Sequence, residues 1–136
     1  NATLWFAKIE CKVTSAEDDN MWMDILSQRI SENTVIYHED VDSSDYVNKP
    51  VLLKEKFDVI VVDGRRRVEC IQNSYDSLTD RGVLILDNSD RSSYDVGRNF
   101  LRNAGFREIQ LSGIPPIIPM KTSTSIFYRK GNCLGI

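Results

Sequence analysis

Four acidic clusters stand where apolar or β-branched runs of this chain end. They are Glu17-Asp18-Asp19, His38-Glu39-Asp40, Asp63-Gly64 and Asp87-Asn88. If the preceding runs are parallel strands, their carboxyl ends meet at one edge of a sheet, where open α/β sheets bind ligands. A carboxylate at such an edge can accept hydrogen bonds from both ribose hydroxyls of a nucleotide. We therefore expect a ligand site here; the alternative is that these side chains only cap the helices that follow.

Asp63, Asp87 and Asn88 form a set of oxygen donors at the ends of two neighbouring strands. Carboxylate and amide oxygens are the ligands that Mg²⁺ and Ca²⁺ prefer, usually together with several waters. The spacing therefore predicts a divalent metal site made of these three side chains.

Three arginines, Arg65-Arg66-Arg67, directly follow the most apolar strand. A guanidinium at this position could clamp a carboxylate or phosphate of a substrate, and we expect Arg65 to act beside Asp63 in catalysis. Three cations at a helix N-terminus oppose the helix dipole, which favours a functional role for at least one of them. Arg91 is a lesser candidate of the same kind. His38, the only histidine, is expected at a surface strand end and not as a general base.

The spacing of apolar residues predicts strands that alternate with helices. Residues 39–56 and 112–120 are expected to be loops, because prolines interrupt both. Alternation of strand and helix is typical of βαβ units. We predict one α/β domain over residues 1–136, with a doubly wound, mostly parallel sheet, helices on both faces and a C-terminal antiparallel β-hairpin. Strands are expected at 12–16, 34–38, 57–62, 83–86, 107–111 and 122–128, and helices at 3–9, 20–30, 68–78 and 94–104. The helix at 68–78 is expected to be closed by a turn at Asp80-Arg81-Gly82, and the strand at 57–62 to be buried on both faces of the sheet.

Composition limits the classes of binding partner and the cellular compartment to be expected for this protein. The 136 residues carry 17 Lys and Arg against 20 Asp and Glu, a net charge of −3, which argues against a nucleic-acid binder. Cys11, Cys70 and Cys133 are odd in number and have no metal-binding spacing, so we expect free thiols in a reducing cytosol. No apolar run approaches the length of a membrane helix. A cytoplasmic protein without a membrane or nucleic-acid partner is expected.

Several segments, in their order along the chain, resemble the class I S-adenosylmethionine-dependent methyltransferases, which have a Rossmann-like fold. FDVIVVDG, then a helix, then RGVLILDN is similar to the fourth and fifth strands of that family. NATLWFAK resembles the helix after its first glycine-rich loop, and VTSAEDDNMW resembles its second strand. The tail GFREIQLSGIPPIIP, with TSTSIFYRK, resembles its closing β-hairpin. The resemblance covers essentially the whole chain.

This resemblance implies S-adenosylmethionine as the cofactor and methyl transfer to a small-molecule acceptor. Thr3 would lie in the cofactor site, and Glu17 would bind the ribose hydroxyls. Asp40, or its neighbour Glu39, would lie near the adenine. Asp63 would stand beside the methionine end and the methyl group.

In the catechol O-methyltransferase-like branch of the family, an Asp after the fourth strand and an Asp-Asn pair after the fifth hold a divalent metal. Asp63, Asp87 and Asn88 match that pattern. The resemblance thus implies a Mg²⁺ ion that orients a substrate oxygen and lowers its pKa.

The first strand and the glycine-rich loop of the family are missing from this sequence, which begins at Asn1. That strand would lie between the strands at 12–16 and 57–62, and without it two sheet edges would be unpaired. Three explanations stay open: a truncated N-terminus, a partner chain, such as the second copy of a homodimer, over the exposed edge, or direct pairing of the two halves into a methyltransferase-like fold that binds no cofactor.

Two alternative functions stay open. One is a non-catalytic, truncated methyltransferase-fold protein that acts through self-association or a partner. The other is a receiver-like phospho-signalling domain, because Asp18-Asp19 and Asp63 imitate its acidic residues. A receiver, however, has Ser or Thr where this chain has Asp87, and Lys-Pro where it has Lys121-Thr122.

Overall fold

The computed structural model describes residues 2–9, 11–115 and 119–136. Asn1 and Pro116, which entered the sequence predictions, lie outside these residues. The contacts divide the chain into two compact units, residues 1–49 and 50–136. Organisation as one domain stays a prediction.

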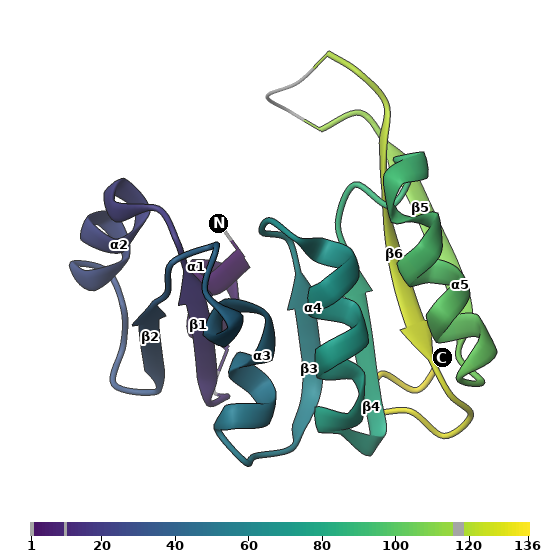
Figure 1. Ribbon diagram of the computed structural model, residues 1–136, viewed down its shortest axis with the longest axis horizontal. Coiled ribbons are helices and arrows are strands. Elements are labelled where there is room, and N and C mark those ends of the chain that lie inside the picture. Colours follow the sequence, from purple (N-terminus) through teal and green to yellow (C-terminus); the bar gives the residue numbers. More distant parts are fainter. Residues whose placement is uncertain (1, 10, 116–118) are drawn as a thin grey trace. The chain divides into compact units, whose positions relative to one another are not determined.

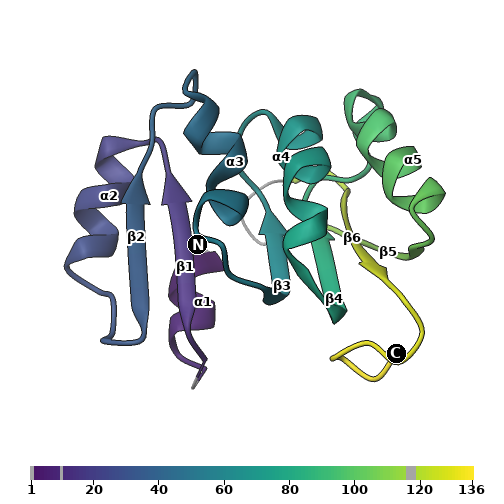
Figure 2. The ribbon, with the colours of Figure 1, turned by 60° about the horizontal axis from the view of Figure 1, so that its bottom comes forward.

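The first unit contains a pair of parallel strands, β1 (Val13–Glu17) and β2 (Thr34–His38). Their register runs from Val13 opposite Thr34 to Glu17 opposite His38, so both carboxyl ends fall at the same edge. Helix α1 (Ala2–Ala7) packs against β1, and α2 (Asn20–Ser27) packs against both strands (Figure 2). Leu26 of α2 is fully buried in this packing.

Helix α3 (Ser44–Leu52) corrects the prediction of a loop over 39–56. The segment is polar and contains Pro50, which we expected to interrupt regular structure. Pro50 instead lies in the last turn, where its missing N–H removes only the bond to the Tyr46 carbonyl. Buried Tyr46 and Val47 anchor the helix. Tertiary packing therefore outweighs the weak helical pattern.

The second unit is built on a four-stranded sheet in the order β3-β4-β6-β5 (Figure 1). Strands β3 (Phe57–Val62) and β4 (Leu78–Leu86) are parallel. Strand β6 (Thr122–Tyr128) is antiparallel both to β4 and to β5 (Arg107–Gly113), so β5 and β6 form the predicted C-terminal hairpin. Together with the parallel β1–β2 pair, this arrangement confirms the predicted α/β fold class.

Two helices, α4 (Arg67–Ser74) and α5 (Asp95–Asn103), cover one face of this sheet (Figure 1). Short 3₁₀ turns, η1 (Tyr75–Ser77) and η2 (Ser92–Tyr94), adjoin them. A Cβ on Gly97 would lie 2.8 Å from Cδ1 of Ile71, so the absence of a side chain lets α5 approach α4 closely. The core beneath consists of Val62, Ile71, Leu78, Leu84, Leu86, Leu101, Phe106 and Phe127.

The boundary between α4 and β4 differs from the prediction. We expected a helix to Leu78 that is closed by a turn at Asp80-Arg81-Gly82, but β4 runs through this segment from Leu78. A Cβ on Gly82 would lie 3.0 Å from the Phe57 carbonyl oxygen and 2.9 Å from Cβ of Leu78. The glycine is therefore needed for close strand approach, not for a turn.

Strand β3 is less buried than its apolar sequence suggests. We expected burial on both faces, as in a central parallel strand. In the described part of the chain β3 has a neighbour, β4, on one side only, and Val62 is its one buried residue. The edge position explains the difference.

The structure also bears on two expectations from composition. In the described segments, no helix is long and apolar enough to cross a bilayer. Cys11, Cys70 and Cys133 are free thiols, as predicted.

Candidate functional site

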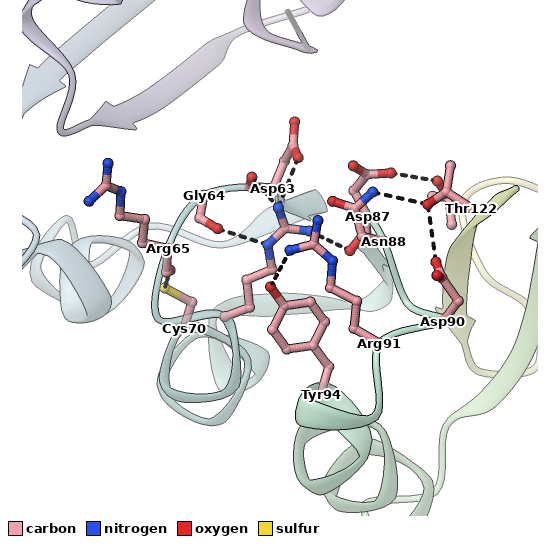
Figure 3. Close-up of polar contacts among 12 residues, drawn as sticks. Asp63, Gly64, Arg65, Cys70, Asp87, Asn88, Asp90, Arg91, Tyr94 and Thr122 are labelled. Atoms are coloured by element: carbon pink, nitrogen blue, oxygen red, sulfur yellow. Dashed lines mark hydrogen bonds and ion pairs between the residues drawn. The ribbon is translucent and has the colours of Figure 1, made fainter. Parts of the chain in front are cut away.

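Asp63 and Asp87 lie side by side at the carboxyl ends of β3 and β4. Val62 pairs with Leu86 in the parallel register, so the next residue of each strand meets the other at the sheet edge (Figure 3). The two carboxyl groups lie close enough for each to affect the ionisation of the other. Burial raises the pKa of Asp63, and the charge of Asp87 and the hydrogen bond with it raise this pKa further; Arg67 partly offsets the effect. The sequence prediction that these two carboxyls come together is therefore met.

Arg67 holds the two strand ends together. It is 7 % exposed, and its guanidinium donates to the carbonyl oxygens of Asp63 at 2.7 Å and Gly64 at 2.8 Å, and also to that of Asp87. Its face lies 5.3 Å from the centre of the Tyr94 ring, a cation–π distance. Sequence reasoning considered the arginine run for substrate binding and missed this clamp. Its partners are backbone carbonyls, and the Asp87 carbonyl lies 20 residues away in the sequence.

The other two arginines of the run are not part of this clamp. Arg66 has a left-handed backbone with a φ of 47°, and its side chain pairs with Glu69. The Arg65 side chain points away from Asp63 in Figure 3. The structure therefore does not bring Arg65 together with Asp63 and Asp87, and a catalytic role for Arg65 stays a prediction.

Asp87 and Asn88 are both fixed by strand β6. The Thr124 hydroxyl donates to Oδ1 of Asp87 at 2.7 Å, and the Asn88 amide donates to Oγ1 of Thr122 at 3.0 Å. Asn88 adopts a left-handed φ of 48°, which turns the chain out of β4. Because the Nδ2 of Asn88 donates to Thr122, its Oδ1 is the atom that is available to coordinate a cation.

The donor set fits a metal only in part. Two adjacent carboxylates and an amide oxygen match the chemistry of Mg²⁺, which completes its shell with water. Over residues 2–9, 11–115 and 119–136, however, no group of three or more His, Cys, Asp or Glu side chains could hold a metal ion. Metal binding by Asp63, Asp87 and Asn88 therefore stays a prediction.

In the first unit, Glu17 ends β1 with a fixed side chain. Its Oε1 accepts hydrogen bonds from the backbone N–H groups of Asp18 at 3.1 Å and Asp19 at 3.2 Å. Asp19 caps α2 by accepting from the N–H groups of Met21 and Trp22. The capping alternative is thus correct for Asp19, whereas Glu17 presents a second carboxylate oxygen that these backbone bonds do not use.

Two more predicted cofactor residues lie in the same unit as Glu17. The Thr3 hydroxyl lies 3.0 Å from that of Ser15, which is on the same face of β1 as Glu17 because side chains alternate along a strand. Oδ1 of Asp40 accepts from the N–H of Asp42 at 2.9 Å in the turn after β2. Its neighbour Glu39 pairs with Lys49. Of the two residues considered for the adenine, Glu39 is therefore the one whose carboxylate is engaged by a lysine.

The chain shares its fold with solved methyltransferases. It matches a Klebsiella pneumoniae protein assigned as an O-methyltransferase with a TM-score of 0.71 and 12% identity, over 93% of this chain and 67% of that one. An rRNA methylase from Streptococcus thermophilus matches with a TM-score of 0.67 and 17% identity, over 95% of this chain and 80% of that one. Precorrin 8w decarboxylase from Methanobacterium thermoautotrophicum matches with a TM-score of 0.64 and 17% identity, over 93% of this chain and 74% of that one. No protein-family model and no curated protein matches the sequence.

These similarities establish the class at the level of fold. The chain has the Rossmann-like α/β fold of the class I methyltransferases, as the resemblance of its sequence implied. The matched structures give no specific support to a receiver domain or to a non-catalytic subunit.

Proposed function

We propose that this protein transfers a methyl group from S-adenosylmethionine to a small-molecule acceptor. The observation that carries the proposal is the methyltransferase fold, which extends over more than nine tenths of the chain. The acidic residues at the strand ends, where open α/β sheets bind ligands, support it further.

Glu17 is the residue that we assign to the cofactor ribose. Two backbone N–H groups hold its Oε1, so the carboxylate is oriented before any ligand arrives. Such preorganisation lowers the entropy cost of binding, since the side chain has less rotamer freedom to lose. We assign Thr3 and Asp40 to the same cofactor.

Asp63 is the residue that we assign to the reacting end of the cofactor, with Arg65 as an acceptor-binding candidate. In a direct methyl transfer the enzyme contributes mainly by aligning the two reactants. The clamp made by Arg67 supports such a role, because it fixes the backbone on both sides of the Asp63–Asp87 pair. A Mg²⁺ ion held by Asp63, Asp87 and Asn88 would polarise an acceptor oxygen.

Calorimetric titration of the full protein with S-adenosylhomocysteine tests the cofactor assignment. We expect saturable binding that Glu17→Gln weakens at least tenfold, because the amide keeps the backbone hydrogen bonds but loses an acceptor oxygen for the ribose. Glu32→Gln is the matched control, since Glu32 is an exposed glutamate in the loop before β2. Equal binding by wild type and Glu17→Gln would remove Glu17 from the site, and an absence of binding at millimolar ligand would remove the cofactor.

We also propose a cytoplasmic protein that works on small molecules, without nucleic-acid or membrane partners. The free cysteines and the net charge of −3 support this. Self-association as a homodimer over an exposed sheet edge is proposed as well. Native mass spectrometry checks it, and a monomer at micromolar concentration would contradict it.

A further inference from the structure

Four consecutive hydroxyl residues of β6, Thr122 to Ser125, bond to four consecutive residues of the turn after β4. Thr124 donates to the Asp87 carboxylate at 2.7 Å, and Thr122 accepts from Asn88 at 3.0 Å and donates to Asp90 at 3.0 Å. The Ser123 N–H donates to Asp90 at 2.8 Å, and the hydroxyls of Ser125 and Ser89 lie 2.7 Å apart.

These contacts begin where the backbone pairing of the strands ends. Strands β4 and β6 pair in antiparallel register up to Leu86 opposite Ser125. One step further along, Asp87 faces Thr124, and the left-handed Asn88 then takes the chain out of the sheet. Side-chain hydroxyls, together with one backbone bond from the Ser89 N–H to the Ser123 carbonyl at 2.7 Å, therefore extend the contact beyond the paired strands.

The serines of this run lie in the interior, where a hydroxyl must be satisfied. Ser89 and Ser125 are 0 % exposed, and burial of a hydroxyl without a partner is unfavourable. Ser125 lies within 2.7 Å of both the Ser89 hydroxyl and Oε1 of Glu108. Glu108 is in turn held by Arg98 of α5. The turn is thus connected through β6 and β5 to a helix, which gives its bonds a rigid base.

We infer that the 122–125 run is the template for the 87–90 turn, and that Thr124 is a positioning residue that sets the direction of the Asp87 carboxylate. With Oδ1 held by Thr124, the carboxylate keeps one orientation relative to Asp63. The inference rests on the proposed function in one respect: methyl transfer is the reaction for which Asp87 is oriented.

Three variants test this in the full protein. Thr124→Val keeps the shape of the side chain and removes the hydroxyl, Thr124→Ser restores it, and Thr124→Ala is a second deletion in case the valine variant does not fold. Thr79→Val is the matched control, because the Thr79 hydroxyl donates to Asp58 at 2.8 Å at the other end of the sheet. The readouts are the carboxyl ¹³C chemical shifts of the aspartates at pH 7 and the kcat and KM of methyl transfer.

We expect Thr124→Val to move the Asp87 carboxyl signal and Thr124→Ser to return it. Thr79→Val should move the signal of Asp58 and leave that of Asp87 in place. The kcat of Thr124→Val should fall by about tenfold or more, since small misplacements of reacting groups cost large rate factors, with little change in the KM for S-adenosylmethionine.

An Asp87 signal that does not respond to loss of the Thr124 hydroxyl overturns the inference. A moved signal with an unchanged kcat overturns the positioning role and leaves the proposed function intact. If the wild-type protein transfers no methyl group, the proposed function fails, and the Asp87 signal alone then decides whether Thr124 is the template.

Discussion

Glu108 of β5 is held by two arginines and a serine, and its substitution gives a sharp prediction. Its side chain is 7 % exposed. Oε1 pairs with Arg98 at 2.9 Å and accepts from Ser125 at 2.7 Å, while Oε2 pairs with Arg102. Glu108→Gln keeps the volume of the side chain and removes the charge.

The loss of unfolding free energy in Glu108→Gln depends on whether Arg98 and Arg102 find other partners or solvent. Breaking a buried ion pair by removal of one partner typically costs about 3–5 kcal/mol, because the other charge is left buried. Here Arg98 keeps a second partner, Asp95, at 3.1 Å, and Arg102, which is 47 % exposed, can turn to solvent. We therefore expect Glu108→Gln to lower the free energy of unfolding by about 2–3 kcal/mol, below the usual range.

Urea unfolding at pH 7 measures this loss. Asp95→Asn is the matched control, because it removes a carboxylate from the same Arg98 but at a half-exposed position, where a pair contributes about 1 kcal/mol or less. A loss below about 1 kcal/mol for Glu108→Gln, or a loss equal to that of the control, would contradict the assignment of a buried network.

The stabilisation of the fold by Glu108 should depend on pH in a definite direction. Burial raises the pKa of Glu108, but hydrogen bonds from Ser125, Arg98 and Arg102 outweigh burial and hold this pKa below its ordinary 4.5. The stabilisation by ionised Glu108 is therefore complete above pH 4.5 and is lost as the pH falls through the lower folded value. The stability difference between wild type and Glu108→Gln should shrink below pH 4.5; a constant difference would refute the sign.

Three further predictions concern the candidate site and the elements that position it. Asp19→Ala should lower the free energy of unfolding by about 1 kcal/mol, as loss of an N-cap does, and a thermal melt that matches wild type would contradict the cap. Arg67→Lys should cost about 2–4 kcal/mol in urea unfolding, because a lysine cannot reach three carbonyls, whereas the more exposed Arg66→Lys should stay within about 0.5 kcal/mol. If Asp63, Asp87 and Asn88 hold Mg²⁺, millimolar Mg²⁺ should raise the melting temperature of wild type and not that of Asp87→Asn; the same melting temperature for wild type with and without Mg²⁺ would remove the metal.

The sequence predicted best those elements whose signal is local. Strands β2 and β3 have the predicted bounds, because β-branched and apolar residues fill them between clear breakers. Helix α3 was missed, since its polar segment is stabilised by buried Tyr46 and Val47 and not by a helical pattern. Gly82 was misread as a turn because its close contact with Phe57 exists only in the folded sheet.

The contacts of the candidate site also fall into those that the sequence could predict and those that it could not. The meeting of Asp63 and Asp87 follows from the rule that parallel strands end at one edge, so it could be predicted. The clamp by Arg67 and the Thr124–Asp87 bond could not, because their partners lie 20 and 37 residues apart and depend on sheet order. A run of four hydroxyl residues in a strand that also carries Phe127 was the available signal, since buried hydroxyls require partners.

Transfer of a labelled methyl group tests the central claim most directly. The full protein is incubated with S-adenosylmethionine that carries a radioactive methyl group and with a cell extract, and the products are separated into small molecules, protein and RNA. The account predicts label in the small-molecule fraction, dependent on Glu17 and Asp63. Label in RNA or protein, or no transfer above a control without the protein, would contradict it.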